Sequence, residues 1–197
     1  MRIAVAGAGY VGLVTAACLA ELGNEVICVD IDEDKIGKLN SGIIPIYEPC
    51  LDELVAKNKK EKRLGFSSDL KGAIRKSEII FICVGTPPKE NGEADLSYVE
   101  DVALTIAEAM DSYKVIVEKS TVPVETGEKV AKSIKNYNVH KADFDVVSNP
   151  EFLREGSAVN DFMHPDRIVI GSESEKANKI MKELYSPLKS PVIFTDI

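Results

Sequence analysis

A glycine-rich turn near the amino terminus has the spacing found in dinucleotide-binding proteins. The stretch GAGYVG contains three glycines, Gly7, Gly9 and Gly12, with Tyr10 and Val11 between the last two. It lies between two apolar runs, the first typical of a strand and the second of a helix. In that context glycines permit a tight turn, close approach of the backbone to a pyrophosphate and close helix packing, and the first helix amides can meet the phosphates. On its own, the spacing is a weak signal.

An acidic residue at the end of the next predicted strand strengthens this prediction. Asp30 lies eighteen residues after Gly12. Its carboxylate is placed to accept hydrogen bonds from a ribose diol and to repel a 2′-phosphate, which favours NAD over NADP. Asp32 is a second candidate, although a solvated loop acid is its more usual role. Turn and acid together predict a dinucleotide site with NAD as cofactor, in preference to a purely structural turn.

Three later loops carry polar side chains beside prolines. They are GTPP at residues 85–88, KSTVP at 119–123 and NPEFLREG at 149–156. Each follows a predicted strand, and the carboxyl ends of parallel strands meet at one edge of a sheet, where ligands bind. For any single loop, a proline or threonine that merely ends a strand is an equally good explanation. Three such loops at the edge of the glycine turn favour a shared site.

The elements that would position these loops alternate along the chain. Short runs rich in valine and isoleucine predict strands at residues 3–6, 26–30, 79–84, 115–118, 146–148, 168–170 and 192–194, and residues 64–66 would supply the short third strand. Helical patterns lie at 12–22, 34–40, 49–59, 69–76, 98–110, 124–137 and 174–185. Pro49 in a first helical turn and Asp69 as a capping side chain support two of these starts. The predicted fold is α/β, a Rossmann-type, doubly wound, mainly parallel sheet with helices on both faces.

Composition excludes several classes of protein. The chain has 197 residues, 45% hydrophobic and 28% charged, which is typical of one ordinary globular domain. Its formal net charge of −8 argues against binding to nucleic acid or to an anionic membrane. The basic run at residues 57–63 is interpreted as a solvated helix end. We therefore expect a small-molecule ligand and neither a nucleic-acid nor a membrane partner.

Cysteine and histidine spacing predicts no metal site. The four cysteines, Cys18, Cys28, Cys50 and Cys83, are too far apart for a CxxC pattern, and the two histidines show no ligand spacing. Reduced thiols and a cytoplasmic location are expected. The apolar opening run imitates an export signal, but its cleavage would remove the glycine turn, so we expect it to be retained.

Four stretches resemble one protein family. AVAGAGYVGLVTAACLAELG, ICVGTPP, EKSTVPVETG and SNPEFLREGSAVNDFMHPDRIVIG are similar to the amino-terminal domain of the UDP-glucose/GDP-mannose dehydrogenases. The resemblance covers essentially the whole chain, and the last stretch is far more specific than the glycine turn. Within the family, HPDRIVIG is more similar to the UDP-glucose branch than to the GDP-mannose or UDP-N-acetylmannosamine branches.

The resemblance implies roles for individual residues. Those that would contact NAD, together with the glycine turn and its Tyr10, are Val11, Asp30, Lys35, Thr86, Thr121 and Glu155. Those that would bind the sugar nucleotide are Glu151, Phe152, Leu153, Arg154 and Glu155. The catalytic residues would be Thr121, Glu151 and Glu155, with a water held by Thr121 and Glu151 relaying the proton of the sugar alcohol. Bonding of Glu151 to local loop amides is the alternative.

The resemblance also implies that residues 1–197 form the NAD-binding domain of a longer, homodimeric enzyme. Such enzymes oxidise an alcohol to an aldehyde and then to an acid with two NAD, and the second step uses a cysteine. That cysteine, with a lysine and an asparagine, would lie on a connecting helix and a carboxyl-terminal domain beyond residue 197. Cys50 is a poor substitute, since nothing places it near the nicotinamide. The chain alone is expected to be inactive and monomeric or weakly associated.

Two other classes stay open at this point. The chain could be a regulatory module that binds NAD without hydride transfer, or the glycine turn could belong to a hydroxyacid-type dehydrogenase.

Overall fold

The computed structural model describes residues 1–120 and 126–196, and in these ranges eight strands form one sheet. The strands are β1 (Arg2–Ala6), β2 (Glu25–Val29), β3 (Leu64–Ser67), β4 (Ile79–Ile82), β5 (Lys114–Glu118), β6 (Phe144–Ser148), β7 (Ile168–Gly171) and β8 (Val192–Thr195). Their order is β3-β2-β1-β4-β5-β6-β7-β8. All neighbouring strands are parallel except β6 and β7, which meet antiparallel at Ser148 and Gly171. The doubly wound, mainly parallel α/β fold is confirmed.

The helices lie between the strands, as predicted. They are α1 (Tyr10–Glu21), α2 (Glu33–Asn40), α3 (Leu51–Lys60), α4 (Leu70–Lys76), α5 (Ser97–Ala109), α6 (Thr126–Tyr137), α7 (Ala158–Met163) and α8 (Glu175–Tyr185), with a 3-10 turn at Ser186–Leu188. The expected cap of α4 is confirmed, since Asp69 accepts a hydrogen bond from the Gly72 amide at 2.8 Å. The predicted start of α3 was wrong. Cys50 has a φ of 67°, so the helix begins after it and Pro49 lies outside.

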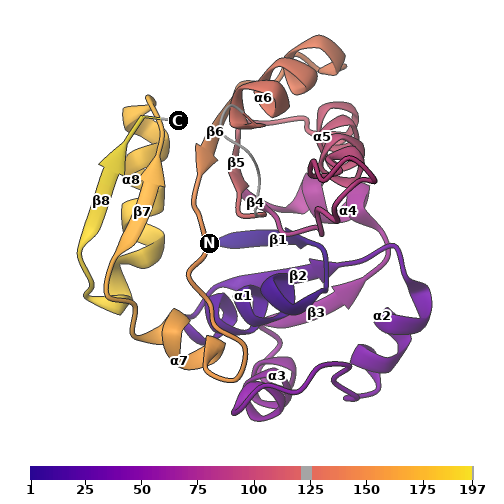
Figure 1. Cartoon of the computed structure of the whole chain (residues 1–197), viewed down its shortest axis with the longest axis vertical. Coiled ribbons are helices and arrows are strands. Elements are labelled where there is room, and N and C mark those ends of the chain that lie inside the picture. Colours follow the sequence, from indigo (N-terminus) through magenta and orange to yellow (C-terminus); the bar gives the residue numbers. More distant parts are fainter. Residues whose placement is uncertain (121–125, 197) are drawn as a thin grey trace.

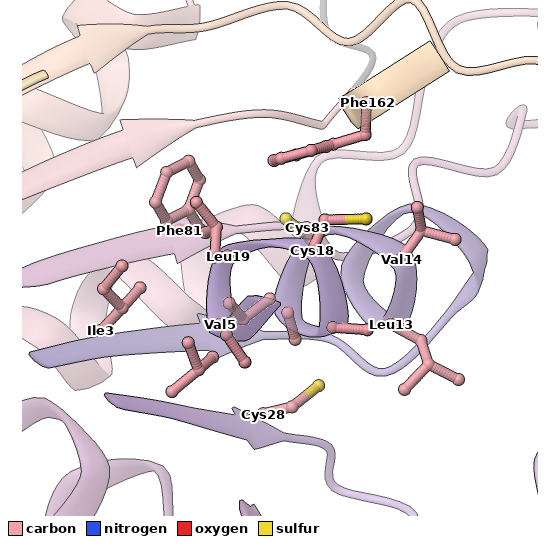
Figure 2. Close-up of a cluster of buried hydrophobic side chains, with 14 of the residues drawn as sticks. Ile3, Val5, Leu13, Val14, Cys18, Leu19, Cys28, Phe81, Cys83 and Phe162 are labelled. Atoms are coloured by element: carbon pink, nitrogen blue, oxygen red, sulfur yellow. The ribbon is translucent and has the colours of Figure 1, made fainter. Parts of the chain in front are cut away.

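One helix was missed by the sequence patterns. α7 has six residues, too few to show a helical period, and it follows the NPEFLREG loop directly. It packs against α1, and its Phe162 is buried in the same core as the side chains of α1. Figure 2 shows Phe162 on one side of α1 and Cys28 of β2 on the other. The loop that precedes α7 is thereby anchored beside the first helix.

The sheet is covered on both faces. In β1, Ile3 and Val5 belong to one buried cluster together with α1, α3, α7 and α8, whereas Ala4 and Ala6 belong to a second with α4, α5 and α6. Figure 1 shows α1 near β1 and β2, α3 next to β3, α5 and α6 beside the strands β4 and β5, and α8 against β7 and β8. Residues 12–20 of α1 are buried without a break. The apolar opening run is therefore explained by a helix buried on all sides.

Candidate functional site

The glycine turn is shaped by steric limits at two of its three glycines. Gly7 has a φ of +103°, and a Cβ there would lie 2.5 Å from the carbonyl oxygen of Cys83. A Cβ on Gly12 would lie 1.9 Å from the carbonyl oxygen of Gly7. The Gly7 amide also donates to the Val29 carbonyl at 2.7 Å. Any side chain at either position would displace the backbone of the turn.

The third glycine faces open space. Gly9 precedes α1, and a Cβ built on it meets no atom within 4 Å. α1 has no side-chain cap and no acidic residue in its first turn. Its positive end and backbone amides are thus left for an anion from outside the helix. This open cradle fits a pyrophosphate that approaches the backbone closely, which is the predicted use of the motif.

Asp30 connects the end of β2 to the glycine turn. Its Oδ2 accepts from the Ala8 amide at 2.8 Å and from Lys35 Nζ at 2.9 Å, and its Oδ1 accepts from the Asp32 amide at 3.0 Å. Partial burial acts to raise the pKa of Asp30, but these hydrogen bonds and the charge of Lys35 outweigh it and hold the pKa below its usual value. The carboxylate is therefore ionised at neutral pH, as an acceptor for a ribose requires.

Asp32 has a different role from that of its neighbour. It caps α2, because its Oδ1 accepts a hydrogen bond from the Lys35 amide at 2.9 Å. Lys35 thus donates through its side chain to Asp30 and through its backbone to Asp32. Asp32 is therefore used as a helix cap, and the predicted contact with the ligand stays with Asp30.

The NPEFLREG loop is held mainly by its own side chains. Asn149 is buried, accepts from the Tyr185 hydroxyl at 2.6 Å and donates to the Val169 carbonyl at 2.8 Å. Glu151 Oε2 accepts from the Leu153 amide at 2.5 Å. That contact with a local amide is the alternative that the sequence left open for Glu151.

An ion pair closes the second half of this loop. The Arg154 guanidinium donates to both oxygens of Asp161 in α7, at 2.7 and 3.1 Å, and the Arg154 amide donates to the same carboxylate at 3.0 Å. The hydrogen bond from Arg154 lowers the pKa of Asp161 to about 2. The Arg154 charge is thereby directed toward α7.

A pocket of about 490 Å³ opens beside this loop. Its walls include four of the predicted substrate residues, Glu151, Phe152, Leu153 and Arg154. Residues outside the predicted set also line it, among them Lys119, Asn160, His164 and Arg167. The Arg167 guanidinium lies 5.2 Å from the centre of the exposed Phe152 ring. The loop and the HPDRIVIG stretch therefore share one pocket.

Lys119 is a buried cation in that pocket. Its Nζ lies 3.4 Å from Asn149 Oδ1 and 5.9 Å from the centre of the Phe162 ring. Burial lowers the pKa of its ammonium group. Lys119 lies in the EKSTVP stretch, so the sequence could have indicated it as a site residue. The prediction was made for the neighbouring hydroxyl groups instead.

Glu48 joins the loop to the glycine turn. This carboxylate is 1% exposed, and it accepts hydrogen bonds from the Tyr10 hydroxyl and from the Gly156 amide, the latter at 2.8 Å. The Gly156 amide also lies 3.2 Å from the Tyr10 hydroxyl oxygen. Burial and the bond to Glu48 raise the pKa of Tyr10 to about 12, so its hydroxyl stays protonated at neutral pH. No sequence motif pointed to Glu48.

The remaining predicted residues lie near this edge or outside the described ranges. Val11 is the second residue of α1, and Thr86 lies in the loop after β4, where it is half-buried. Glu155 is exposed in the loop and is not among the residues that line the pocket. Thr121 lies outside the described residues, so its proposed contacts stay predictions.

The comparisons with known proteins decide the family. A sequence model of the UDP-glucose/GDP-mannose dehydrogenase family, NAD binding domain, matches residues 1–189. The chain belongs to this family. NAD is accordingly the cofactor that the domain binds, and the open cradle at Gly9 and the ionised Asp30 suit it.

Relatives and solved structures agree with this assignment. The chain is 56% identical to a UDP-glucose 6-dehydrogenase of Bacillus subtilis, TuaD, over 100% of this chain and 42% of the relative, and 52% identical to one of Rhizobium meliloti, over 99% and 46%. A UDP-glucose dehydrogenase from Pyrobaculum islandicum superposes with a TM-score of 0.95 at 39% identity, covering 98% of this chain and 46% of that one. A ternary complex of GDP-mannose dehydrogenase from Pseudomonas aeruginosa gives 0.95 at 40% identity, covering 100% and 47%. The chain thus spans less than half the length of these proteins.

The described residues contain four free cysteines. Three cysteines, Cys18, Cys28 and Cys83, are buried and free, and burial raises the pKa values of Cys18 and Cys83 to about 12. Cys50 is free and exposed before α3.

Within residues 1–120 and 126–196, no cluster of three or more histidine, cysteine or acidic side chains could hold a metal. Over the same ranges, every helix is too short or too polar to cross a membrane.

Proposed function

We propose that this chain forms the NAD-binding part of a UDP-glucose 6-dehydrogenase, which oxidises UDP-glucose to UDP-glucuronate in two steps. The observation that carries the proposal is the position of the NPEFLREG loop. Its Gly156 amide lies 3.2 Å from the hydroxyl of Tyr10, the first residue of α1, and the carbonyl of Arg154, a residue of the pocket wall, lies 3.4 Å from the same hydroxyl. The loop therefore links the pocket to the start of α1. A sugar nucleotide in the pocket would therefore have its reacting end near a cofactor bound at the turn.

The residues of the chain suit the first oxidation. When the cofactor is bound, its nicotinamide supplies the acceptor for the hydride from the sugar alcohol. The proton of the alcohol needs an acceptor nearby, and Glu151 provides a carboxylate in the pocket wall. We propose that Glu151 acts with Thr121 through a water, and that Glu155 assists at the cofactor side. Because Glu151 is bonded to the Leu153 amide, its second oxygen is the one proposed to face the water.

The other parts of the proposal concern the longer protein. The cysteine of the second oxidation, with its lysine and asparagine partners, would come from a segment outside residues 1–197, and the longer protein would be a homodimer. A cytoplasmic location is proposed because four free cysteines suit a reducing compartment. The domain assignment of residues 1–197 as one NAD-binding unit belongs to the same proposal.

The test compares three substrates with the protein that includes this chain and its downstream segment. NADH formation is followed by absorbance with UDP-glucose, GDP-mannose and UDP-N-acetylmannosamine. We expect turnover with UDP-glucose, and we expect residues 1–197 alone to bind NAD without forming NADH. Preference for another sugar nucleotide would move the assignment to that branch. Absence of turnover with all three, alongside NAD binding, would favour a regulatory module.

A further inference from the structure

Glu48 is a buried carboxylate in the segment between α2 and α3, outside every motif. It is 1% exposed, whereas the preceding Tyr47 is 88% exposed. Among the described residues, no lysine, arginine or histidine nitrogen lies within 4 Å of it. A charge buried without a cation is costly unless hydrogen bonds replace the lost water. The donors around Glu48 are therefore essential to its placement.

Those donors come from two distant parts of the chain. On one side the Tyr10 hydroxyl donates to Glu48 Oε2. On the other side the Gly156 amide donates to the same oxygen at 2.8 Å, and the Val159 amide lies 3.5 Å from Oε1. Tyr10 begins α1 at the cofactor turn, and Gly156 ends the loop whose earlier residues line the pocket. A single carboxylate is thus bonded to both halves of the site.

We infer that Glu48 is a positioning residue that couples NAD binding at the glycine turn to the ordering of the loop at residues 149–157. A ligand that stabilises the start of α1 holds Tyr10 in place, and through Glu48 it holds the amides of Gly156 and Val159. Such coupling is reciprocal, so an ordered loop strengthens NAD binding by the same factor. The inference rests on the proposed role of this loop as part of the substrate site.

The test measures amide hydrogen exchange at Gly156 and NAD affinity in the same chain. In the unchanged protein, we expect saturating NAD to slow exchange of the Gly156 amide about tenfold. The reason is that bound NAD would stabilise the charge-assisted hydrogen bond from this amide to Glu48. Glu48→Gln replaces one acceptor oxygen by a donor group at nearly constant volume. We expect it to weaken NAD binding about tenfold in calorimetric titration and to abolish the slowing at Gly156.

The matched control loosens the same loop at its other anchor. Asp161→Asn weakens the ion pair with Arg154 and leaves the side chains of Glu48 and Tyr10 unchanged. We expect NAD affinity to stay within about twofold and the NAD-dependent slowing at Gly156 to persist. The inference is wrong if Glu48→Gln keeps that slowing, if the unchanged protein shows none, or if both variants lose it equally.

A second variant covers the case in which Glu48→Gln fails to fold, as judged by loss of a cooperative thermal transition. Tyr10→Phe removes one donor and leaves the carboxylate with its backbone partners. It should reduce the NAD-dependent slowing at Gly156 to less than half, and unchanged slowing would overturn the inference. No sugar nucleotide is needed, so failure of the coupling leaves the proposed oxidation standing, and failure of the oxidation leaves the coupling measurable.

Discussion

The glycine turn and the loop at residues 149–157 form the two halves of the candidate site, and different forces hold them. The turn is confined by backbone contacts that leave no room for a Cβ at Gly7 or Gly12. The loop is held by polar contacts, from Asn149 to Tyr185, from Arg154 to Asp161 and from Gly156 to Glu48. Gly7 and Gly12 therefore tolerate almost no substitution, whereas a loop held by separate hydrogen bonds loses stability one bond at a time.

The largest effect is expected from Gly12→Ala. Its Cβ would lie 1.9 Å from the Gly7 carbonyl oxygen, so α1 must move away from β1. We expect a loss of about 3 kcal/mol in the free energy of unfolding, measured by urea titration, together with loss of NAD binding. A loss below about 1 kcal/mol would contradict the steric confinement of the turn at Gly12.

Gly9→Ala separates ligand contact from folding within the same turn. A Cβ there meets no protein atom within 4 Å, so the free energy of unfolding should change by less than about 1 kcal/mol. NAD affinity should fall at least about tenfold, because the methyl group occupies the space of the pyrophosphate. Unchanged affinity in calorimetric titration would place the phosphates elsewhere.

Asp30→Asn tests the polar contact that belongs to the turn. We expect NAD to bind about tenfold more weakly and the preference for NAD over NADP to narrow, since the charge that repels a 2′-phosphate is lost. Asp32→Asn is the control, because it changes the cap of α2 and leaves Asp30 in place. If NADP bound the unchanged chain more tightly than NAD, the role of Asp30 would be refuted.

The smallest effect concerns the ion pair of the loop. The pKa of Asp161 is about 2 in the folded chain, below the value of about 3.9 for an unfolded aspartate. A lowered pKa stabilises the fold above pH 4, and that contribution is lost as the pH falls from about 4 to 2. Solvent screening limits it to about 1 kcal/mol or less. Asp161→Asn should remove this part of the pH dependence of the free energy of unfolding, measured by urea titration at several pH values. An equal loss of stability between about pH 4 and 2 in both proteins would contradict the prediction.

Much of the fold was predictable because its signals are local. Continuous apolar runs marked the central strands β1, β4 and β5, since strands buried on both faces are apolar almost throughout. Asp30 and the glycines were identified because spacing alone places them at the carboxyl ends of adjacent strands. α7 escaped prediction because six residues cannot display a helical period. The antiparallel meeting of β6 and β7 also has no signature in residue types.

The site shows the same division. Residue types and their order along the chain were sufficient for the α/β fold and the family, and they drew attention to the glycine turn and the loop at residues 149–157, because each depends on short-range pattern. Tertiary contacts were needed to bring Glu48 to Tyr10 and Gly156, and to bury Lys119 beside Asn149. These pairs are distant in sequence, and glutamate and lysine side chains are usually solvated. Packing against α1 and α7 removes their water and makes their few hydrogen bonds decisive.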